Sequence, residues 1–226
     1  MFPYIFVFQG DVNHCNRFAL NAGIVGKSKT AEDPMEQTTH ARYMGRVIAG
    51  QILSVYDRAE EINTGEIRFG TEEIALANNR DCDRIEEALA VQAEYNRCLK
   101  EYGQGKNADG MAIKSPNGMS VPEARRIIRM QSAPEYYYDS VFALKVGEFV
   151  FAGLPGEPFT EIGRRIYDHS PFEKSVLCCL TNSSCGYIAT SRAFEEGGYE
   201  ALTSSYKKGA DDAMVEGMLS LLNKIK

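Results

Sequence analysis

Three segments of the sequence join an apolar run to a polar turn that carries a side chain suited to chemistry. The first, FQGDVN, ends in Asn13, and the second, LPGEPFTEIGRR, carries a lone carboxylate at Glu157. The third, LTNSSCGYIATSRAFEEGGYEA, contains Tyr187 and Tyr199. Ligands of α/β proteins bind beyond the ends of strands. The three turns are therefore expected to converge on one site.

Glu157 has two interpretations. Pro158 suits the first position of a helix, which would place Glu157 near the N-cap. There the helix dipole favours an ionised carboxylate, as a metal ligand requires. Alternatively, an acidic residue before a helix-opening proline is simply a good cap. Residue types alone leave both interpretations open.

Two common catalytic motifs are not supported. NAGIVGKSKT resembles a phosphate-binding loop, but Asn21 stands where that loop requires its first glycine. The sequence has no Gly-x-Ser-x-Gly turn, and His14, His40 and His169 lie in unrelated contexts. His40, early in the first predicted helix, is expected to lie at the surface or to have its hydrogen bonds satisfied. His169 is expected at the end of a helix, where the dipole favours a cationic imidazole.

Taken in order, the motifs resemble the C-terminal half of the catalytic domain of the neutral/alkaline (non-lysosomal) ceramidase family, of the bacterial type. FQGDVN is similar to the family's Gly-Asp-x-Ser/Asn-Pro turn, and LPGEPFTEIGRR to its Pro-Gly-Glu followed by a helix with Gly-Arg-Arg. LTNSSCGYIAT, with GGYEA further on, is similar to the family's Asn-x-x-x-x-Tyr-Val-Thr-Thr stretch with its later Tyr-Glu. KGADDAMVEGMLSLL matches the helix that follows. Each motif is weak alone, and the ordered set is what makes the resemblance specific.

The resemblance implies a zinc-dependent hydrolase that cleaves an N-acyl (amide) bond, as in ceramide. In that family two histidines, a glutamate and a tyrosine hold zinc, and a zinc-activated water attacks the amide carbonyl. By position, the resemblance assigns Glu157 and Tyr187 as metal ligands and Tyr199 as the group that stabilises the oxyanion. Asn13 occupies the turn position at which the well-studied ceramidases carry an active-site serine.

Both histidine ligands of the family lie upstream of the Gly-Asp turn, whereas His14 follows it. A catalytic zinc normally has three protein ligands and a water, and two oxygen donors make a poor zinc site. The chain is therefore expected to be a fragment of a catalytic domain that is inactive alone and binds zinc weakly or not at all. The missing N-terminal half of the enzyme is its expected partner. The alternatives are a catalytically silent α/β domain that keeps the fold but binds no metal, and an unrelated α/β hydrolytic domain in which Glu157 is a plain helix cap.

The elements that would position these residues interleave strands and helices, which predicts an α/β class with a mixed sheet and flanking helices. Apolar runs predict strands at 4–9, at 66–70 and 73–77, on either side of Gly147-Glu148 and at 175–180. Helices are predicted at 38–59, 80–102, 120–130, 158–169 and 210–225, the third from the capping-box spacing that starts at Ser120. Three apolar faces are expected. The strands at 66–70 and 73–77 share one, with Ile67, Phe69, Ile74 and Leu76, and the helix at 80–102 has another, with Ile85, Leu89, Tyr95 and Leu99. The third face belongs to the helix at 38–59 and contains Met44, Val47, Ile48, Ile52, Val55 and Ala59.

Composition bounds the remaining possibilities. The 226 residues suit one domain, and 44% apolar with 25% charged residues is ordinary for a globular protein. A net charge of −6, with no basic patch among aromatics, argues against a nucleic-acid partner. No run is long enough to span a membrane, and MFPYIFVFQGD lacks the basic start of a signal peptide. The six scattered cysteines favour free thiols in a reducing compartment, and hence the cytoplasm.

Overall fold

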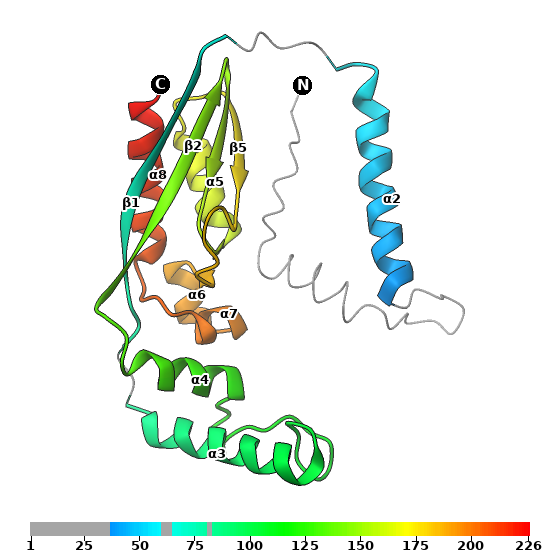
Figure 1. Ribbon diagram of the computed structural model, residues 1–226, viewed down its shortest axis with the longest axis vertical. Coiled ribbons are helices and arrows are strands. Elements are labelled where there is room, and N and C mark those ends of the chain that lie inside the picture. The colour runs from blue at the N-terminus through cyan, green and yellow to red at the C-terminus, as the bar shows by residue number, and fades with distance from the viewer. Residues whose placement is uncertain (1–36, 60–64, 81–82) are drawn as a thin grey trace.

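A mixed four-stranded sheet forms the centre of the fold, and Figure 1 shows it in the computed structural model, which describes residues 37–59, 65–80 and 83–226. The strands are β1 (Ile67–Ala77), β2 (Tyr136–Val146), β3 (Phe149–Gly153) and β5 (Lys174–Cys178), in the order β1-β2-β3-β5. The first three pair antiparallel, and β3 pairs parallel with β5. Two short strands, β4 (Glu157–Pro158) and β6 (Tyr187–Ile188), form a separate parallel pair. The predicted α/β class with a mixed sheet is confirmed.

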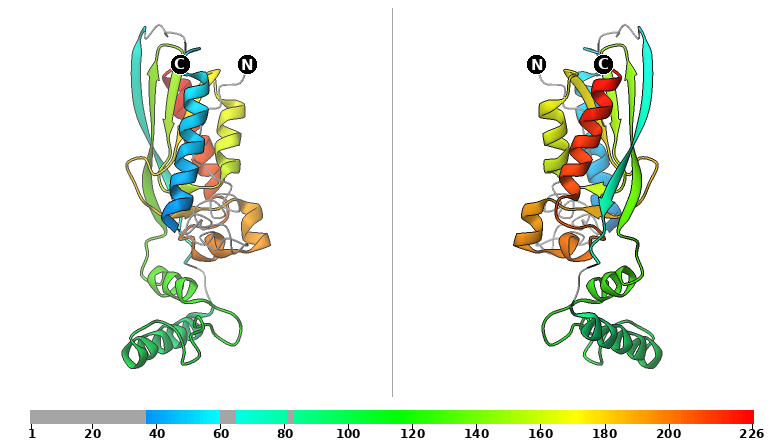
Figure 2. Two further views of the ribbon diagram at one scale, coloured as in Figure 1. Left: turned by 90° about the vertical axis from the view of Figure 1, so that its right-hand side faces the viewer. Right: turned by 90° about the vertical axis from the view of Figure 1, so that its left-hand side faces the viewer.

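One face of the sheet holds the main core. Helices α5 (Thr160–His169) and α8 (Ala210–Lys224) cover this face (Figure 2). The sheet contributes buried side chains from alternate positions of each strand, since successive side chains point to opposite faces. They are Ile74 and Leu76 of β1, Val141 and Ala143 of β2, and Val150 and Ala152 of β3. Met214, Met218, Leu221 and Leu222 of α8 and Ile162 and Ile166 of α5 complete this core.

The opposite face of the sheet is also apolar, but it is open. Ile67 and Phe69 are 64% and 74% exposed, and Tyr138 and Phe151 are exposed beside them on β2 and β3. The expectation that Ile67 and Phe69 share a face with Ile74 was wrong. β1 is one continuous strand, so odd and even positions point to opposite faces. Among the residues that the structure describes, no helix covers these apolar side chains in the way that α5 and α8 cover the other face.

A smaller core joins α3 (Ile85–Tyr102) to α4 (Val121–Met130) and to the loop between them. Ala88, Val91 and Cys98 of α3 are buried against Ile113, Met119 and the inner face of α4. The predicted inward positions Leu89 and Leu99 were wrong, because both are exposed. The smaller Ala88 and Cys98 take the buried stripe instead. The predicted N-cap is confirmed: the Ser120 hydroxyl accepts a hydrogen bond from the backbone N–H of Glu123 at 3.4 Å.

The remaining helices within the described ranges are α2 (Gln37–Tyr56), α6 (Ser191–Glu196) and α7 (Tyr199–Thr203). Most of α2 from Gly45 onward is exposed, including the apolar positions Val47, Ile52 and Val55 that were expected to pack together. None of the helices in the three described ranges is long and apolar enough to cross a membrane. The predicted strand at 4–9 and the turn with Asn13 lie outside the described residues.

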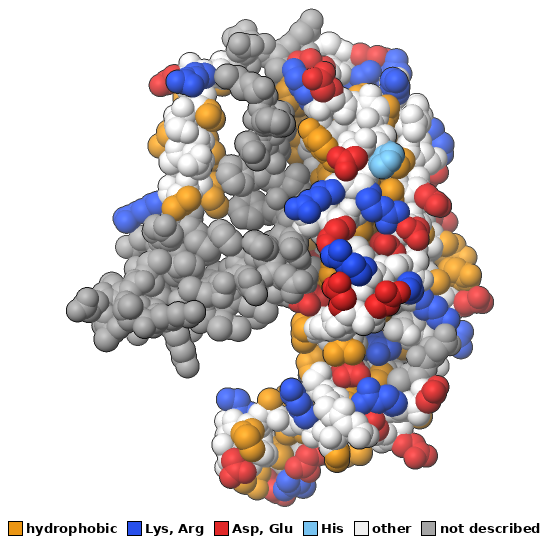
Figure 3. Space-filling view, turned by 180° about the vertical axis from the view of Figure 1, so that it is seen from behind, with side chains coloured by type: hydrophobic (Ala, Val, Ile, Leu, Met, Phe, Trp, Pro, Cys, Tyr) orange, Lys and Arg blue, Asp and Glu red, His pale blue; other side chains and the backbone are white. Residues whose placement is uncertain are grey.

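Seen from behind, the helical side of the molecule carries cations and anions in alternation (Figure 3). Arg165 of α5 pairs with Asp211 and Asp212 of α8 at 3.2 and 2.6 Å. Lys208 pairs with Glu195 of α6 in the same way. Charges on this side are therefore largely neutralised by neighbours, in contrast to the groove described below.

Candidate functional site

A tight turn after β3 delivers Glu157 to the site. The chain leaves the sheet at Gly153 and turns at Gly156, whose φ of 61° is in the left-handed region. A Cβ at Gly156 would lie 2.5 Å from the carbonyl oxygen of Gly186 and 2.6 Å from the Cys185 sulfur. A glycine is therefore required here on both conformational and steric grounds. This is why the apolar run breaks at this point of the sequence.

Glu157 and Tyr187 face each other across the β4–β6 pair, because they are register partners. Their neighbours Pro158 and Ile188 are buried, so Glu157 and Tyr187 point together to the opposite, solvent-facing side. The Glu157 N–H donates to the Gly186 carbonyl at 2.8 Å and the Phe159 N–H to the Ile188 carbonyl at 3.0 Å. The strand pairing thus brings a carboxylate and a phenol from distant parts of the chain to the same place.

The expected position of Glu157 at a helix N-cap was wrong. α5 begins at Thr160, its N-cap is Phe159, and Glu157 lies in a strand. The pairing with β6 continues through Phe159 and delays the start of the helix. Neither the helix-cap interpretation nor the dipole argument therefore explains why an acid stands at this position.

Tyr199 joins the same cluster from the first position of α7. Its ring packs edge-on against Tyr187, with centroids 6.2 Å apart and planes at 74°. Glu200 follows directly. We call Glu157, Tyr187, Tyr199 and Glu200 the acid–tyrosine cluster. The predicted convergence of Glu157, Tyr187 and Tyr199 is thus observed, whereas Asn13 lies outside the described residues.

The members of the acid–tyrosine cluster influence one another's protonation. Burial raises the pKa of Tyr187, and the nearby Glu157, Tyr199 and Glu200 raise it further. Burial also raises the pKa of Glu200, with the charge of Glu157 adding to the effect. Glu200 was missed as a site residue. Its only signal in the sequence is its position next to Tyr199.

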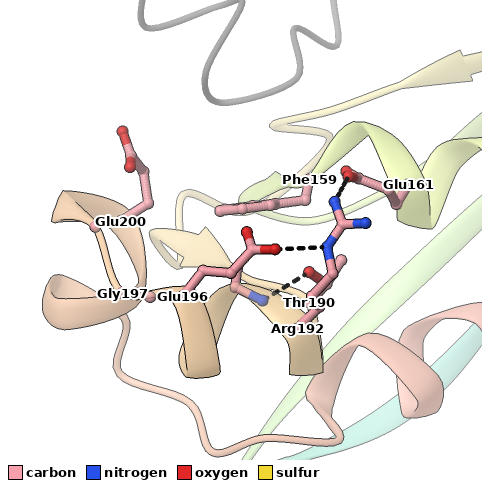
Figure 4. A pocket seen from close by; sticks show the side chains of 10 residues that line it. Phe159, Glu161, Thr190, Arg192, Glu196, Gly197 and Glu200 are labelled. Atoms are coloured by element: carbon pink, nitrogen blue, oxygen red, sulfur yellow. Dashed lines mark hydrogen bonds and ion pairs between the residues drawn. The ribbon is translucent and has the colours of Figure 1, made fainter.

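A small pocket of about 100 Å³ lies beside the cluster, between the start of α5 and helices α6 and α7 (Figure 4). Arg192 in this pocket is bound by two carboxylates, Glu161 at 3.1 Å and Glu196 at 3.2 Å. Glu200 lies on the α7 side and points away from Arg192 (Figure 4). The cation of this pocket is therefore already paired, and the volume suits a few water molecules rather than a substrate.

A larger groove of about 720 Å³ begins at the cluster itself, since both Tyr187 and Tyr199 line it. Its walls come from α4, from β2, from the segment before β6 and from α7 with the loop after it. The groove gathers three arginines, five tyrosines and one aspartate: Arg125, Arg126, Arg129, Tyr137, Tyr138, Tyr187, Tyr199, Tyr206 and Asp139. The sequence showed no basic patch among aromatics because these residues come from separate segments. The fold assembles such a patch.

The donor set of the cluster matches a zinc site only in part. Glu157 and Tyr187 offer two oxygen donors, whereas zinc sites contain at least three protein ligands and favour nitrogen or sulfur. Within the described ranges, no group of three or more His, Cys, Asp or Glu residues could hold a metal ion. The described residues alone therefore do not complete a zinc site.

The fold resembles that of solved ceramidases. No family model matches the sequence, and no curated protein matches it either. Neutral ceramidase from Pseudomonas aeruginosa superposes with a TM-score of 0.54 and 14% identity, over 88% of this chain and 35% of that one. A ceramidase complexed with C2 gives a TM-score of 0.52 and 12% identity, over 82% and 34%. The chain thus spans about a third of the length of these structures. At these identities the similarity supports a ceramidase-like fold rather than membership of the family.

Proposed function

We propose that this chain contributes part of the catalytic centre of a zinc-dependent hydrolase that cleaves an N-acyl amide bond. The observation that carries the proposal is the pairing of Glu157 with Tyr187 across β4 and β6, with Tyr199 in contact. The ceramidase-like fold supports the reaction class, since the proteins of similar fold are ceramidases.

In this proposal Tyr199 stabilises the transition state. Tyr199 is 51% exposed as a residue and its ring lies against Tyr187, so its side chain is placed to meet a substrate next to the cluster. A phenol O–H can donate a hydrogen bond to the oxyanion that forms when an amide carbonyl is attacked. Asn13, in the turn that carries a serine in the well-studied ceramidases, is proposed to provide a further polar contact to the substrate.

Glu157 and Tyr187 are proposed as two of the ligands of the zinc ion, with the remaining ligands coming from outside the described residues. Zinc, when bound, would supply a Lewis acid and an activated water. Tyr187 must lose its proton to become a good ligand, and its raised pKa opposes that loss. Metal binding at this pair should therefore strengthen as the pH rises.

The rival proposal is a catalytically silent domain, and the incomplete donor set among the described residues favours it. Zinc affinity of the full chain, measured by competition with a fluorescent chelator, separates the two. We expect weak binding that is lost in both Glu157→Gln and Tyr187→Phe. The matched control Glu196→Gln removes a carboxylate that pairs with Arg192 and should leave the affinity unchanged.

Two outcomes would contradict the proposal. Zinc binding that is the same in the wild type and in both ligand variants would remove Glu157 and Tyr187 from the metal site. Efficient hydrolysis of an N-acyl substrate by residues 1–226 alone would show that the chain already holds a complete centre, against the partial donor set described above.

A further inference from the structure

We propose that the arginine-lined groove binds a carboxylate of the substrate, so that the amide cleaved at the cluster is an N-acylated, acidic amine such as an N-acyl amino acid. This inference rests on the proposed function for the reaction. The binding of a carboxylate by the groove stands on separate observations.

The cations of the groove lie on one stripe of α4. Arg129 lies three residues after Arg126 and four after Arg125, so each of the two neighbouring arginines shares a side of the helix with Arg129. Arg125 and Arg129 are exposed, whereas Arg126 is buried and its Nε donates to the Leu202 carbonyl at 3.1 Å. The buried arginine thus fixes the helix against α7, and the two exposed arginines remain at the surface of the groove.

Neutral partners hold the exposed arginines without cancelling their charge. The Arg125 Nε donates to the Gln92 side-chain oxygen at 3.0 Å, and its guanidinium lies 4.5 Å from the centre of the Tyr95 ring. Arg129 donates to the Ser205 hydroxyl at 2.8 Å. No carboxylate of the described ranges forms an ion pair with Arg125 or Arg129, whereas Arg97, Arg165 and Arg192 each pair with two.

The acidic residue of the groove does not supply the missing counter-charge. Asp139 accepts hydrogen bonds from the Ser183 hydroxyl at 2.8 Å and from the Ser140 N–H at 3.0 Å. The lining therefore carries three cations against one anion, on a chain whose net charge is −6. A local excess of positive charge on an acidic protein attracts an anionic ligand.

The position of the groove links this charge to the reaction. Tyr187 and Tyr199 belong both to the groove lining and to the acid–tyrosine cluster, so one ligand can contact both. A volume of about 720 Å³ lies within the range of small-molecule sites. The planar guanidinium forms two parallel hydrogen bonds with a carboxylate, which gives arginine its selectivity for that group.

Two probes of similar size test the inference on the full chain without zinc. N-hexanoylglycine carries a carboxylate where N-hexanoylethanolamine carries a hydroxyl, and their affinities can be compared by calorimetry. We expect the glycine conjugate to bind about tenfold more tightly, because hydrogen bonds to charged groups are the stronger ones. The preference should disappear in the Arg125→Gln/Arg129→Gln double variant and should fall with added salt.

Two controls keep the test interpretable. Arg97→Gln removes an exposed arginine of α3 that pairs with Glu94 and Glu101, and it should retain the full preference. The Arg125→Lys/Arg129→Lys variant keeps both charges and should retain part of it. Unchanged binding of the hydroxyl probe to the double glutamine variant would show that the groove is still folded.

Equal affinity for the two probes, or a preference that survives in the double glutamine variant, would overturn the inference. Inorganic phosphate that competes better than acetate would also overturn it and would point to a phosphorylated ligand. The carboxylate preference needs neither zinc nor turnover. A chain that shows the preference but loses no zinc affinity in Glu157→Gln would therefore refute the proposed metal site alone.

Discussion

Gly156→Ala is the sharpest test of how the fold positions Glu157. Two costs add at this position. An alanine held at the φ of 61° costs about 1–2 kcal/mol, because the left-handed region is unfavourable for residues with a Cβ. The new Cβ would also lie 2.5 Å from the Gly186 carbonyl oxygen, a backbone atom that cannot rotate away. Forcing extra atoms into a packed site costs about 1–3 kcal/mol.

Together these terms predict a loss of about 3.5 kcal/mol in the free energy of unfolding, the middle of the summed range. Gly186→Ala is the matched control. It has a φ of 85°, but its Cβ would meet nothing within 4 Å. It should lose only the conformational cost of about 1–2 kcal/mol. The difference between the two variants isolates the close approach of the turn to the segment before β6.

Equilibrium urea unfolding of both variants measures this difference. Gly156→Ala should also weaken the binding of zinc by the chain, since the shift separates Glu157 from Tyr187. If Gly156→Ala destabilises no more than Gly186→Ala, within the few tenths of a kcal/mol that such measurements resolve, the steric argument fails.

Three further outcomes follow from the structure. In the folded protein the pKa of Glu200 is raised above 4.5. The stability that this group contributes is therefore present below that pH and is lost as the pH rises through the folded-state pKa. Glu200→Gln should raise the thermal midpoint at neutral pH and leave it unchanged in acid. Asp211→Ala should lower the free energy of chemical unfolding by about 2 kcal/mol, because the buried carboxylate accepts hydrogen bonds from Arg165 at 3.2 Å and from the Ser191 hydroxyl at 3.2 Å. Asp212→Ala removes an exposed partner of Arg165 and should lower it by less than about 1 kcal/mol. Exposed apolar patches favour association, so Phe69→Ser, on the exposed face of the sheet, should reduce self-association in sedimentation velocity with little loss of stability. An unchanged sedimentation profile would contradict the expectation that this face mediates self-association.

Local signals predicted the helices whose ends are marked by residues in the sequence itself. The α4 helix begins where the capping box at Ser120 placed it, and α8 matches the last predicted helix to within one residue at its end. These signals lie within a few residues of the element they define, so they can be identified without knowledge of the fold. The strands around Gly147 were predictable for the same reason, since a turn separates two apolar runs.

Strand pairing between distant segments determined the features that local sequence signals did not predict. Pro158 favours a helix start by local preference, but its strand pairs with Ile188 from a distant segment, and the helix begins later. Similarly, the phase of β1 was misjudged because both faces of the sheet are apolar. A period-two pattern shows which residues share a face, but not which face a helix will cover. Ile67 and Phe69 are exposed because α5 and α8 pack on the face that carries Ile74 and Leu76.

The short helix α7 lies between the acid–tyrosine cluster and the arginines of the groove, and it contacts both. Tyr199, at its first position, contacts Tyr187. Near its other end, the Leu202 carbonyl accepts from the buried Arg126, and Ser205 beyond it accepts from Arg129. The five-residue helix α7 thus joins the proposed oxyanion donor to the segment that contacts the cations proposed to hold the carboxylate. A ligand that drew Arg129 away from Ser205 would act on the segment that follows α7. The proposed carboxylate site and the Tyr199 hydroxyl would therefore be coupled through this one helix.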